Sequence, residues 1–321
     1  LRGFSGYGVA FCHLHAFIYN NAHLEYLSLL FVEFFFILSG FVLYPQLIQV
    51  LNNKKNLVIF YKRRWLRTLP LYFITLILVA SLFNDEFGAD FFKYLFFIQK
   101  TVPNFLTNDY YPVAWSLSIE EFFYLLFPLI IIFFGKKNSI RKIILFFIFL
   151  LIFKTFIATN IDLNFFRTGT FFRFDAILLG FILRFFYNNN IKYKFIPAIF
   201  LIFFMYIFYN FENFILSNGE DYVIKVSFIL LLQIISVLTL ITFTLFEPLM
   251  KINFIRNFSI LISTQTYSVY LIHIIFIYLL EKAQLGINNT VFIYIILLFV
   301  SSSLIFKFIE KPILQIRPKL H

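Results

Sequence analysis

The chain opens with Leu1-Arg2-Gly3-Phe4-Ser5-Gly6-Tyr7-Gly8-Val9-Ala10-Phe11-Cys12-His13, an apolar stretch with an arginine near its start and a histidine at its end. Eleven residues of α-helix make about three turns, so Arg2 and His13 lie on one face, about 16 Å apart along the axis. In a membrane, Arg2 then lies at one surface and His13 near the midplane. An imidazole at that depth is costly unless it is paired or functional.

The composition places the rest of the chain in a lipid bilayer as well. Of its 321 residues, 61% are hydrophobic and 13% are charged, whereas soluble domains carry about 25% charged residues. The net charge of +11 comes without a basic stripe outside the apolar stretches. We therefore expect no nucleic-acid partner and attribute the charge to the positive-inside bias. The single Cys12 excludes an intrachain disulfide, and the histidines are too scattered for a metal site.

We predict an all-α polytopic membrane protein with about ten transmembrane helices, because about twenty apolar residues span a bilayer. Basic residues gather in alternate connections and acidic residues in the others, which places both termini in the cytoplasm. Residues 1–321 are expected to form a single transmembrane domain with no appended extracytoplasmic domain. The expected spans are 3–20, 27–50, 68–83, 113–134, 140–158, 170–187, 194–211, 224–246, 258–280 and 289–308.

The longest connection on the acidic side, residues 84–112, is rich in aromatic side chains. An interfacial aromatic belt is the favoured interpretation. A cap whose aromatic faces contact sugar rings is the alternative.

Several ionisable side chains inside the expected spans share one depth. At 1.5 Å per residue, they lie between the midplane and the outer third of a hydrocarbon core about 30 Å thick. A shared polar layer predicts a functional cavity, because intramembrane ionisable groups are otherwise expensive. The residues are His13, Glu33, Glu120, Glu121, Arg173, Asp175 and His273.

Within this layer, His13 is the expected general base, and Glu120, or next Glu33, is the expected carboxylate that orients it. Ser116, Glu120 and Tyr124 recur every four residues on one helix face, where the hydroxyls can position a substrate or stabilise an oxyanion. The alternative for this face is ordinary hydrogen bonding between helices. For His273, a structural hydrogen bond to the first span is favoured over a role as a second base.

A second group of charges lies where the first and third spans meet the cytoplasm. Arg64 and Arg67 share a helix face at i, i+3 spacing. Together with Arg2 they form a positive site suited to phosphates. A charge cluster that only sets the orientation of the protein is the alternative interpretation.

These residues also resemble the signature of the acyltransferase-3 family of bacterial inner-membrane acyltransferases, which modify sugars of surface polysaccharides. Glu33 stands where the family usually has Asp, and the Trp115–Tyr124 motif is the most specific match. The matching segments follow in order over nearly the whole chain: Arg2 to His13, Glu33–Phe41, Arg64–Arg67 with Pro70–Tyr72, Trp115–Tyr124 with Pro128, Leu178–Gly180, Tyr267–His273 and Glu310–Pro312.

The resemblance implies a multi-pass protein of the bacterial cytoplasmic (inner) membrane, with acyl-CoA, most often acetyl-CoA, as the donor. The CoA phosphates are then expected at Arg2, Arg64 and Arg67, and a glycan or lipid-linked sugar is the expected acceptor at the outer face. Two alternatives remain. The chain can be an acyl translocator that serves a separate periplasmic transferase, or a polysaccharide or solute transporter without chemistry.

Overall fold

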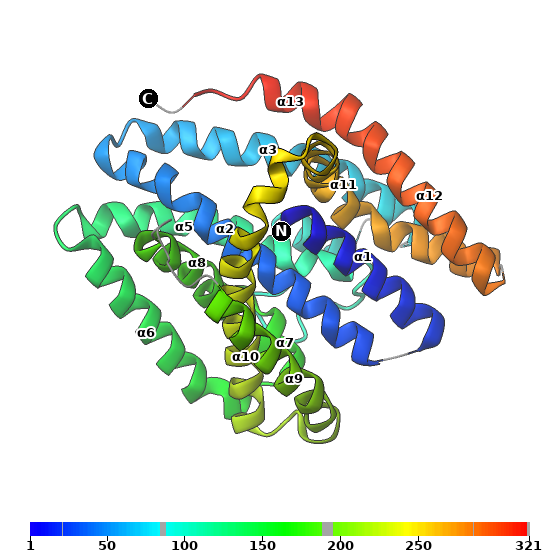
Figure 1. The fold of residues 1–321 in the computed structure, drawn as a ribbon, viewed down its shortest axis with the longest axis horizontal. Helices are drawn as coiled ribbons and strands as arrows, with labels where there is room; N and C mark the ends of the chain where they lie inside the picture. The colour runs from blue at the N-terminus through cyan, green and yellow to red at the C-terminus, as the bar shows by residue number, and fades with distance from the viewer. Residues whose placement is uncertain (21, 84–87, 188–194, 285, 320–321) are drawn as a thin grey trace.

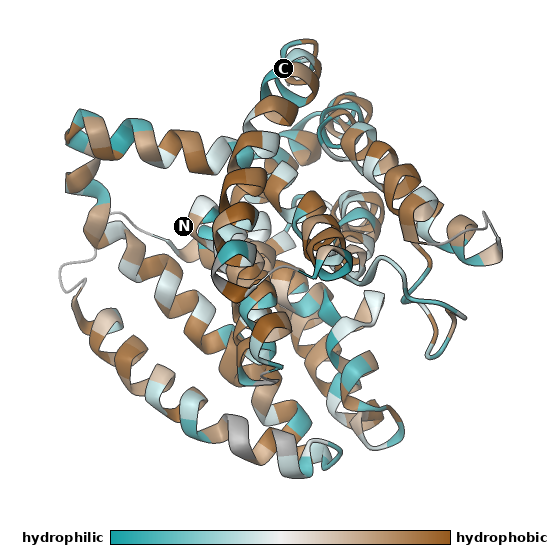
Figure 2. Cartoon of the chain, turned by 90° about the vertical axis from the view of Figure 1, so that its right-hand side faces the viewer, coloured by the Kyte–Doolittle hydropathy of each residue, from teal (hydrophilic) through white to brown (hydrophobic). Residues whose placement is uncertain are grey.

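In the computed structural model, which describes residues 1–20, 22–83, 88–187, 195–284 and 286–319, all regular secondary structure within these ranges is helical (Figure 1). Hydrophobic residues, coloured brown in Figure 2, occur along nearly every helix. The longer helices are α1 (Arg2–Tyr19), α2 (Ala22–Asn52), α3 (Asn56–Phe83), α5 (Trp115–Phe134), α6 (Ser139–Ile157), α8 (Phe174–Phe186), α9 (Phe195–Asn218), α10 (Tyr222–Thr242), α11 (Asn253–Ala283) and α12 (Ile287–Ile305).

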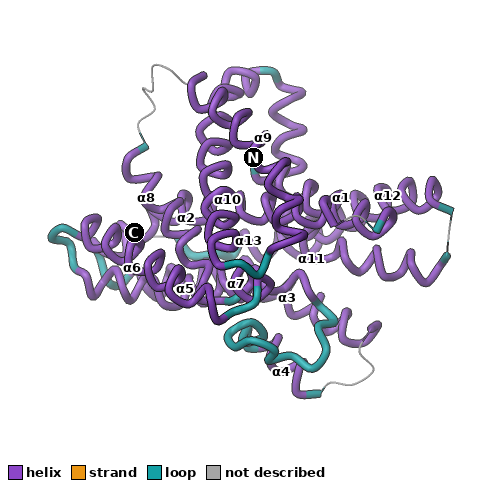
Figure 3. The backbone as a smooth tube through the Cα atoms, turned by 90° about the horizontal axis from the view of Figure 1, so that it is seen from below, coloured by secondary structure: helices purple, strands orange, loops and turns teal. Residues whose placement is uncertain are grey.

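Short helical segments connect these elements. They are α4 (Ala89–Leu95), α7 (Leu163–Thr168), α13 (Lys311–Gln315), the 3₁₀ turns η1 (Pro112–Ala114), η2 (Ala158–Asn160), η3 (Thr170–Arg173) and η4 (Phe243–Lys251), and the π-helical η5 (Phe306–Glu310). Figure 3 shows α4 and the long loop that follows it lying together beside α3.

Within the described residues, seven helical segments are long and apolar enough to cross a membrane, and Phe195–Phe211 adds a shorter apolar helix. The prediction of an all-α fold is confirmed, and seven to eight long apolar helices among the described residues, rather than the ten expected, are consistent with a polytopic membrane protein. Helices occupy all ten expected ranges, but α1, α8 and α9 are not among the seven, and α9 contributes only the shorter apolar helix. Helix α1 carries Arg2, His13 and His15, and α8 has only 13 residues. Helix α1 packs against α2 and α11, and α8 packs against α2.

Helices α1 and α11 run side by side in parallel, and α2 packs against α1 in the opposite direction (Figure 1). The parallel register shows in two hydrogen bonds. Tyr7 donates to Gln265 over 2.8 Å, and the rings of His13 and His273 meet at 2.9 Å, so the contacts advance in the same direction along both helices. This register brings the histidine of the first segment against the histidine of α11.

Helices α2 and α8 cross at two glycines, Gly40 and Gly180. A Cβ at Gly40 would lie 1.8 Å from the carbonyl oxygen of Ile177, and one at Gly180 would lie 1.9 Å from that of Ile37. Both contacts are with backbone, which cannot move aside as a flexible side chain does. The two glycines therefore let the helix backbones touch.

Gly180→Ala is expected to lower the free energy of unfolding by about 1–3 kcal/mol or more, because the added methyl forces α2 and α8 apart. Thermal unfolding in detergent measures this loss. Gly286→Ala is the matched control, because a Cβ there meets no atom within 4 Å among the described residues. Equal melting temperatures for the two variants would contradict the close crossing.

Hydrogen bonds to Asp90 of α4 hold the loop that follows this helix. Asp90 accepts hydrogen bonds from Lys93 Nζ at 2.8 Å and from the backbone N–H groups of Thr107 and Asn108 at 2.9 and 2.7 Å. Burial alone would raise its pKa, but these donors hold the pKa of Asp90 below its ordinary value.

The aromatic residues of α4 and of the loop that follows it differ in burial. Tyr94, Tyr110 and Tyr111 are buried against the bundle, while Phe92 and Phe96 are exposed. The loop is therefore in part a packed cap.

Candidate active site

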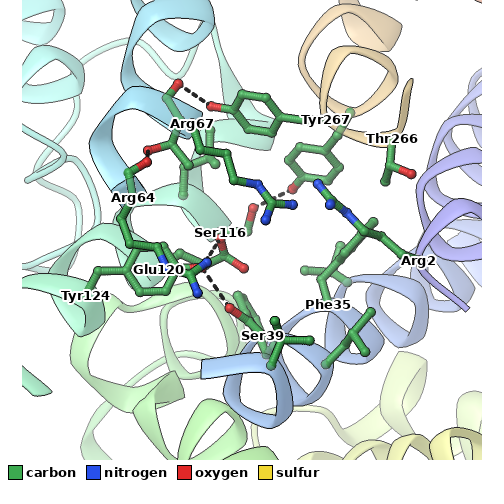
Figure 4. Close-up of a pocket in the computed structure, with 17 residues that line it drawn as sticks. Arg2, Phe35, Ser39, Arg64, Arg67, Ser116, Glu120, Tyr124, Thr266 and Tyr267 are labelled. Carbon is green, nitrogen blue, oxygen red and sulfur yellow. Dashed lines mark hydrogen bonds between the residues drawn. The ribbon is translucent and has the colours of Figure 1, made fainter. Parts of the chain in front are cut away.

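The first cavity, which we call the arginine cavity, lies among α1, α2, α3, α5 and α11 (Figure 4). It has room of about 140 Å³. All three arginines expected to bind phosphate line it, as do the three polar residues from one face of α5. Those six residues are Arg2, Arg64, Arg67, Ser116, Glu120 and Tyr124.

The three guanidinium groups differ in how they are held. Arg64 donates to Gln46 Oε1 over 2.9 Å, and its guanidinium lies 5.2 Å from the centre of the Tyr124 ring. Arg2 and Arg67 have no hydrogen bond or ion pair with any described residue, and their guanidinium groups face each other across the cavity in Figure 4. Three cations and the single carboxylate of Glu120 leave an excess of positive charge, which an anionic ligand can balance.

The hydroxyl groups of this cavity form two ordered pairs. Tyr124 donates to Glu120 Oε2 over 2.9 Å, so Ser39, 2.7 Å from the same phenol oxygen, donates to Tyr124. Tyr270 donates to the carbonyl of Val113 over 3.0 Å, so Ser116, 2.6 Å away, donates to Tyr270. Lone pairs of Ser116 therefore remain available to a ligand.

A second cavity, which we call the histidine cavity, contains His13. It is larger, at about 520 Å³. Charged, amide and aromatic side chains line it together, a mixture that suits a polar ligand with apolar faces. Besides His13 the lining includes Asn20, Glu25, Ser28, Lys100, Asp109, Trp115, Asn164, Arg167 and Tyr278.

His13 is held between two polar partners. Its Nδ1 lies 2.9 Å from His273 Nε2, and its Nε2 lies 3.0 Å from the hydroxyl oxygen of Ser28. His273 is fully buried, and its Nδ1 lies 2.7 Å from the carbonyl oxygen of Tyr270. The hydrogen bond expected between His273 and the first span is present.

The two cavities follow one another along the same helices. On α11, Thr266, Tyr267 and Tyr270 line the arginine cavity, and Ile274, Ile277 and Tyr278 line the histidine cavity. Along α1 the chain likewise passes the arginine cavity first and the histidine cavity second. Along α2 and α5, which run in the opposite direction, it passes the histidine cavity first. Tyr270, its partner Ser116 and the carbonyl of Val113 form the wall between the cavities.

The carboxylate expected beside His13 is not there. Among the described residues, Glu120 bonds to Tyr124 and Glu33 bonds to Arg173, and neither reaches the imidazole. Glu33 lines neither cavity. The expectation that one of these carboxylates orients His13 is therefore wrong. The sequence predicts one depth for these residues, but their helices turn their side chains in different directions.

Glu33 belongs instead to a buried network of two cations and two anions. Arg173 donates to Glu33, and Lys154 donates to Asp175 over 2.6 Å. Gln233 donates to the same oxygen of Asp175 over 2.7 Å. All four charged side chains are at least 95% buried. The network joins α2, α6, η3, α8 and α10.

Glu33→Gln is expected to destabilise the protein by about 3–5 kcal/mol, because it leaves the buried charge of Arg173 without its counter-ion. A lower melting temperature in detergent measures the effect. Glu281→Gln is the control, because Glu281 is exposed and has no ion pair with any described residue, so its replacement leaves no buried charge behind. An unchanged melting temperature combined with lost activity would restore Glu33 as a catalytic candidate.

Several residues of the site escaped the sequence analysis. Ser28, Ser39 and Gln46 are polar residues in an apolar helix and carry no distinctive spacing. Tyr270 and His273 lie three residues apart, which places them on neighbouring positions of one helix face. His273 was already expected in the shared polar layer, and this spacing places Tyr270 beside it.

Comparison with known proteins gives a family assignment. The model of a family described as "Acyltransferase domain" matches residues 1–308. The O-acetyltransferase OatA of Staphylococcus aureus is 28% identical over 98% of this chain and 56% of its own length. An uncharacterized protein of Haemophilus influenzae is 29% identical over 50% of this chain and 76% of its own length.

The chain spans about half the length of OatA. No solved structure matches it. The family match extends over almost the entire chain and includes both cavities. The chain therefore belongs to the acyltransferase-3 family of membrane O-acyltransferases, as a distant homologue of OatA.

Proposed function

We propose that this protein is a membrane O-acyltransferase that moves an acyl group, with acetyl the expected one, from cytoplasmic acyl-CoA to a sugar hydroxyl at the outer face of a bacterial cytoplasmic membrane. One observation carries the proposal. A cavity with excess arginine charge and a cavity that presents a histidine nitrogen follow one another along the same four helices.

The positive charge of the arginine cavity supports it as the donor site. Arg2, Arg64 and Arg67 offer charge-assisted hydrogen bonds to the phosphates of CoA. The cavity they line, at about 140 Å³, is smaller than pockets that enclose a drug-sized ligand. We therefore place the acyl-pantetheine end inside the cavity and the nucleotide at its mouth. The connections near this end carry Lys54, Lys55, Lys136 and Lys137, which supports a cytoplasmic position for it and for both termini.

The size and polarity of the histidine cavity support it as the acceptor site. The histidine cavity has room of about 520 Å³. Trp115 and Tyr278 offer faces for a sugar ring, and Asn20, Asn164 and Arg167 offer hydrogen-bond donors. A hydroxyl of the sugar would lie against His13 Nε2.

The proposed reaction is a direct transfer. His13 Nε2 takes the proton of the sugar hydroxyl as its oxygen attacks the thioester carbonyl, which gives a tetrahedral oxyanion. The carbon–sulfur bond then breaks, an ester forms, and the departing thiolate takes the proton from His13. The thioester must pass the wall at Tyr270 and Ser116 to reach the acceptor, and the Ser116 hydroxyl can donate to the oxyanion when it turns its proton away from Tyr270.

Purified protein with radiolabelled acetyl-CoA and oligosaccharides released from bacterial cell envelopes tests the proposal. Ester-linked label on an oligosaccharide is the expected result. Turnover of acetyl-CoA without transfer to any sugar would favour an acyl translocator that needs a separate periplasmic partner enzyme. An absence of acetyl-CoA turnover would favour a transporter.

A further inference from the structure

We propose that His273 is a positioning residue, which holds His13 in the tautomer whose Nε2 lone pair faces the histidine cavity. The inference rests on the proposed function, in which His13 is the base. It assigns to a second buried histidine the task that a carboxylate performs in serine hydrolases.

The direction of the hydrogen bonds is set by one fixed acceptor. The carbonyl of Tyr270 can only accept, so the nitrogen 2.7 Å away, His273 Nδ1, carries a proton. A neutral imidazole has one N–H, so His273 Nε2 presents a lone pair. His13 Nδ1, 2.9 Å from that lone pair, must then be the protonated nitrogen of its own ring. The lone pair of neutral His13 is left on Nε2.

The position of Nε2 gives this tautomer its use. His13 and Ser28 both line the histidine cavity, and their polar atoms lie 3.0 Å apart. A sugar hydroxyl that enters the cavity can therefore donate to Nε2. The opposite tautomer would present an N–H there and could not take a proton.

Ser28 completes the hydrogen-bond chain at its other end. Its single hydroxyl proton has two possible acceptors, His13 Nε2 at 3.0 Å and the carbonyl of Glu25 at 2.6 Å. While His13 is neutral, the Ser28 hydroxyl can donate its hydrogen bond to the Glu25 carbonyl, which leaves the lone pair of Nε2 open to the acceptor hydroxyl. Once His13 is protonated, Nε2–H donates to Ser28, Ser28 donates to Glu25, and Nδ1–H donates to His273. Every donor between the carbonyls of Glu25 and Tyr270 is then satisfied without a carboxylate.

Loss of the His273 imidazole is expected to reverse the tautomer of His13. In His273→Leu, Nδ1–H of His13 has no acceptor, whereas Nε2–H still has Ser28. His13 is then expected to adopt the Nε2–H tautomer, which is inactive as a base toward the cavity. In His273→Gln, the amide oxygen can accept from His13 and the amide nitrogen can donate to Tyr270, so the original tautomer is expected to persist.

Nitrogen-15 NMR of histidine-labelled protein in lipid nanodiscs tests the assignment without any activity. The His13 signals are identified by their loss in His13→Gln. We expect a protonated Nδ1 and an unprotonated Nε2 in the unaltered protein and in His273→Gln, and the reverse in His273→Leu. An Nε2–H tautomer in the unaltered protein would overturn the proposal, even if neither His273 variant folded.

Turnover supplies the second measurement. With labelled acetyl-CoA and envelope oligosaccharides, His273→Leu is expected to lower kcat by about 100-fold or more with little change in the KM for acetyl-CoA. His273→Gln is expected to recover much of that loss, and His15→Ala is the control on the same helix as His13. Equal losses in the Leu and Gln variants would contradict a positioning role. If the unaltered protein transfers no acetyl group, the proposed function fails, and the NMR result still decides the tautomer.

Discussion

His13→Ala is expected to abolish acyl transfer while leaving donor binding intact. The alanine has no nitrogen to take the proton of the acceptor hydroxyl, and a general base of this kind contributes about 10²–10⁴-fold. The donor site is untouched, because His13 does not line the arginine cavity. Label transferred from acetyl-CoA to envelope oligosaccharides measures the first quantity, and the Kd for CoA measures the second.

His15→Ala provides the matched control for this variant. His15 is also a histidine of α1, but its Nδ1 bonds to the backbone carbonyl of Phe11 over 2.9 Å and its side chain lines neither cavity. We expect its transfer rate to stay close to that of the unaltered protein. Full transfer by His13→Ala would contradict the assignment of His13 as the general base. An equal loss of transfer in both variants would indicate damage to α1.

Arg67→Gln is expected to raise the Kd for CoA by about 10- to 100-fold. A hydrogen bond to a charged group contributes about 1.5–3 kcal/mol, and each 1.4 kcal/mol is tenfold in affinity. Arg67 is chosen because it has no hydrogen bond or ion pair with any described residue, so its replacement breaks no internal contact. Binding of CoA to protein in nanodiscs, measured by calorimetry, gives the Kd.

Lys62→Gln is the control for the arginine variant. Lys62 lies on the same helix, is exposed and does not line the arginine cavity. Its Kd for CoA is expected to stay within about twofold of the original value, since exposed charges contribute little. An unchanged Kd for CoA in Arg67→Gln would contradict phosphate binding by this cluster and would favour a charge cluster that only sets the orientation of the protein in the membrane.

Much of the site could be predicted from helix periodicity. Ser116, Glu120 and Tyr124 were expected on one face of one helix, and all three line the arginine cavity. Arg64 and Arg67 were expected to join Arg2, and the structure brings the three together. These inferences needed only the repeat within a helix and the register between neighbouring spans.

The partner of His13 could not be predicted in the same way, because depth fixes only one coordinate. Ser28 and Glu33 lie on the same helix, but five residues of α-helix turn through about 500°, which places them about 140° apart. Ser28 therefore faces His13, and Glu33 faces α8 and Arg173. His273 was expected in the same layer as His13. The direction of its hydrogen bond, however, is set by the backbone carbonyl of Tyr270, and no pattern of side chains in the sequence indicates that contact.

The central claim is that donor and acceptor approach the His13 layer from opposite faces of the membrane. Everted vesicles that contain the protein, with envelope oligosaccharides enclosed and radiolabelled acetyl-CoA outside, test it most directly. We predict acetyl ester on the enclosed oligosaccharides, and none when acetyl-CoA is enclosed and the oligosaccharides are outside. Acetylation of oligosaccharides on the same face as acetyl-CoA would contradict the account.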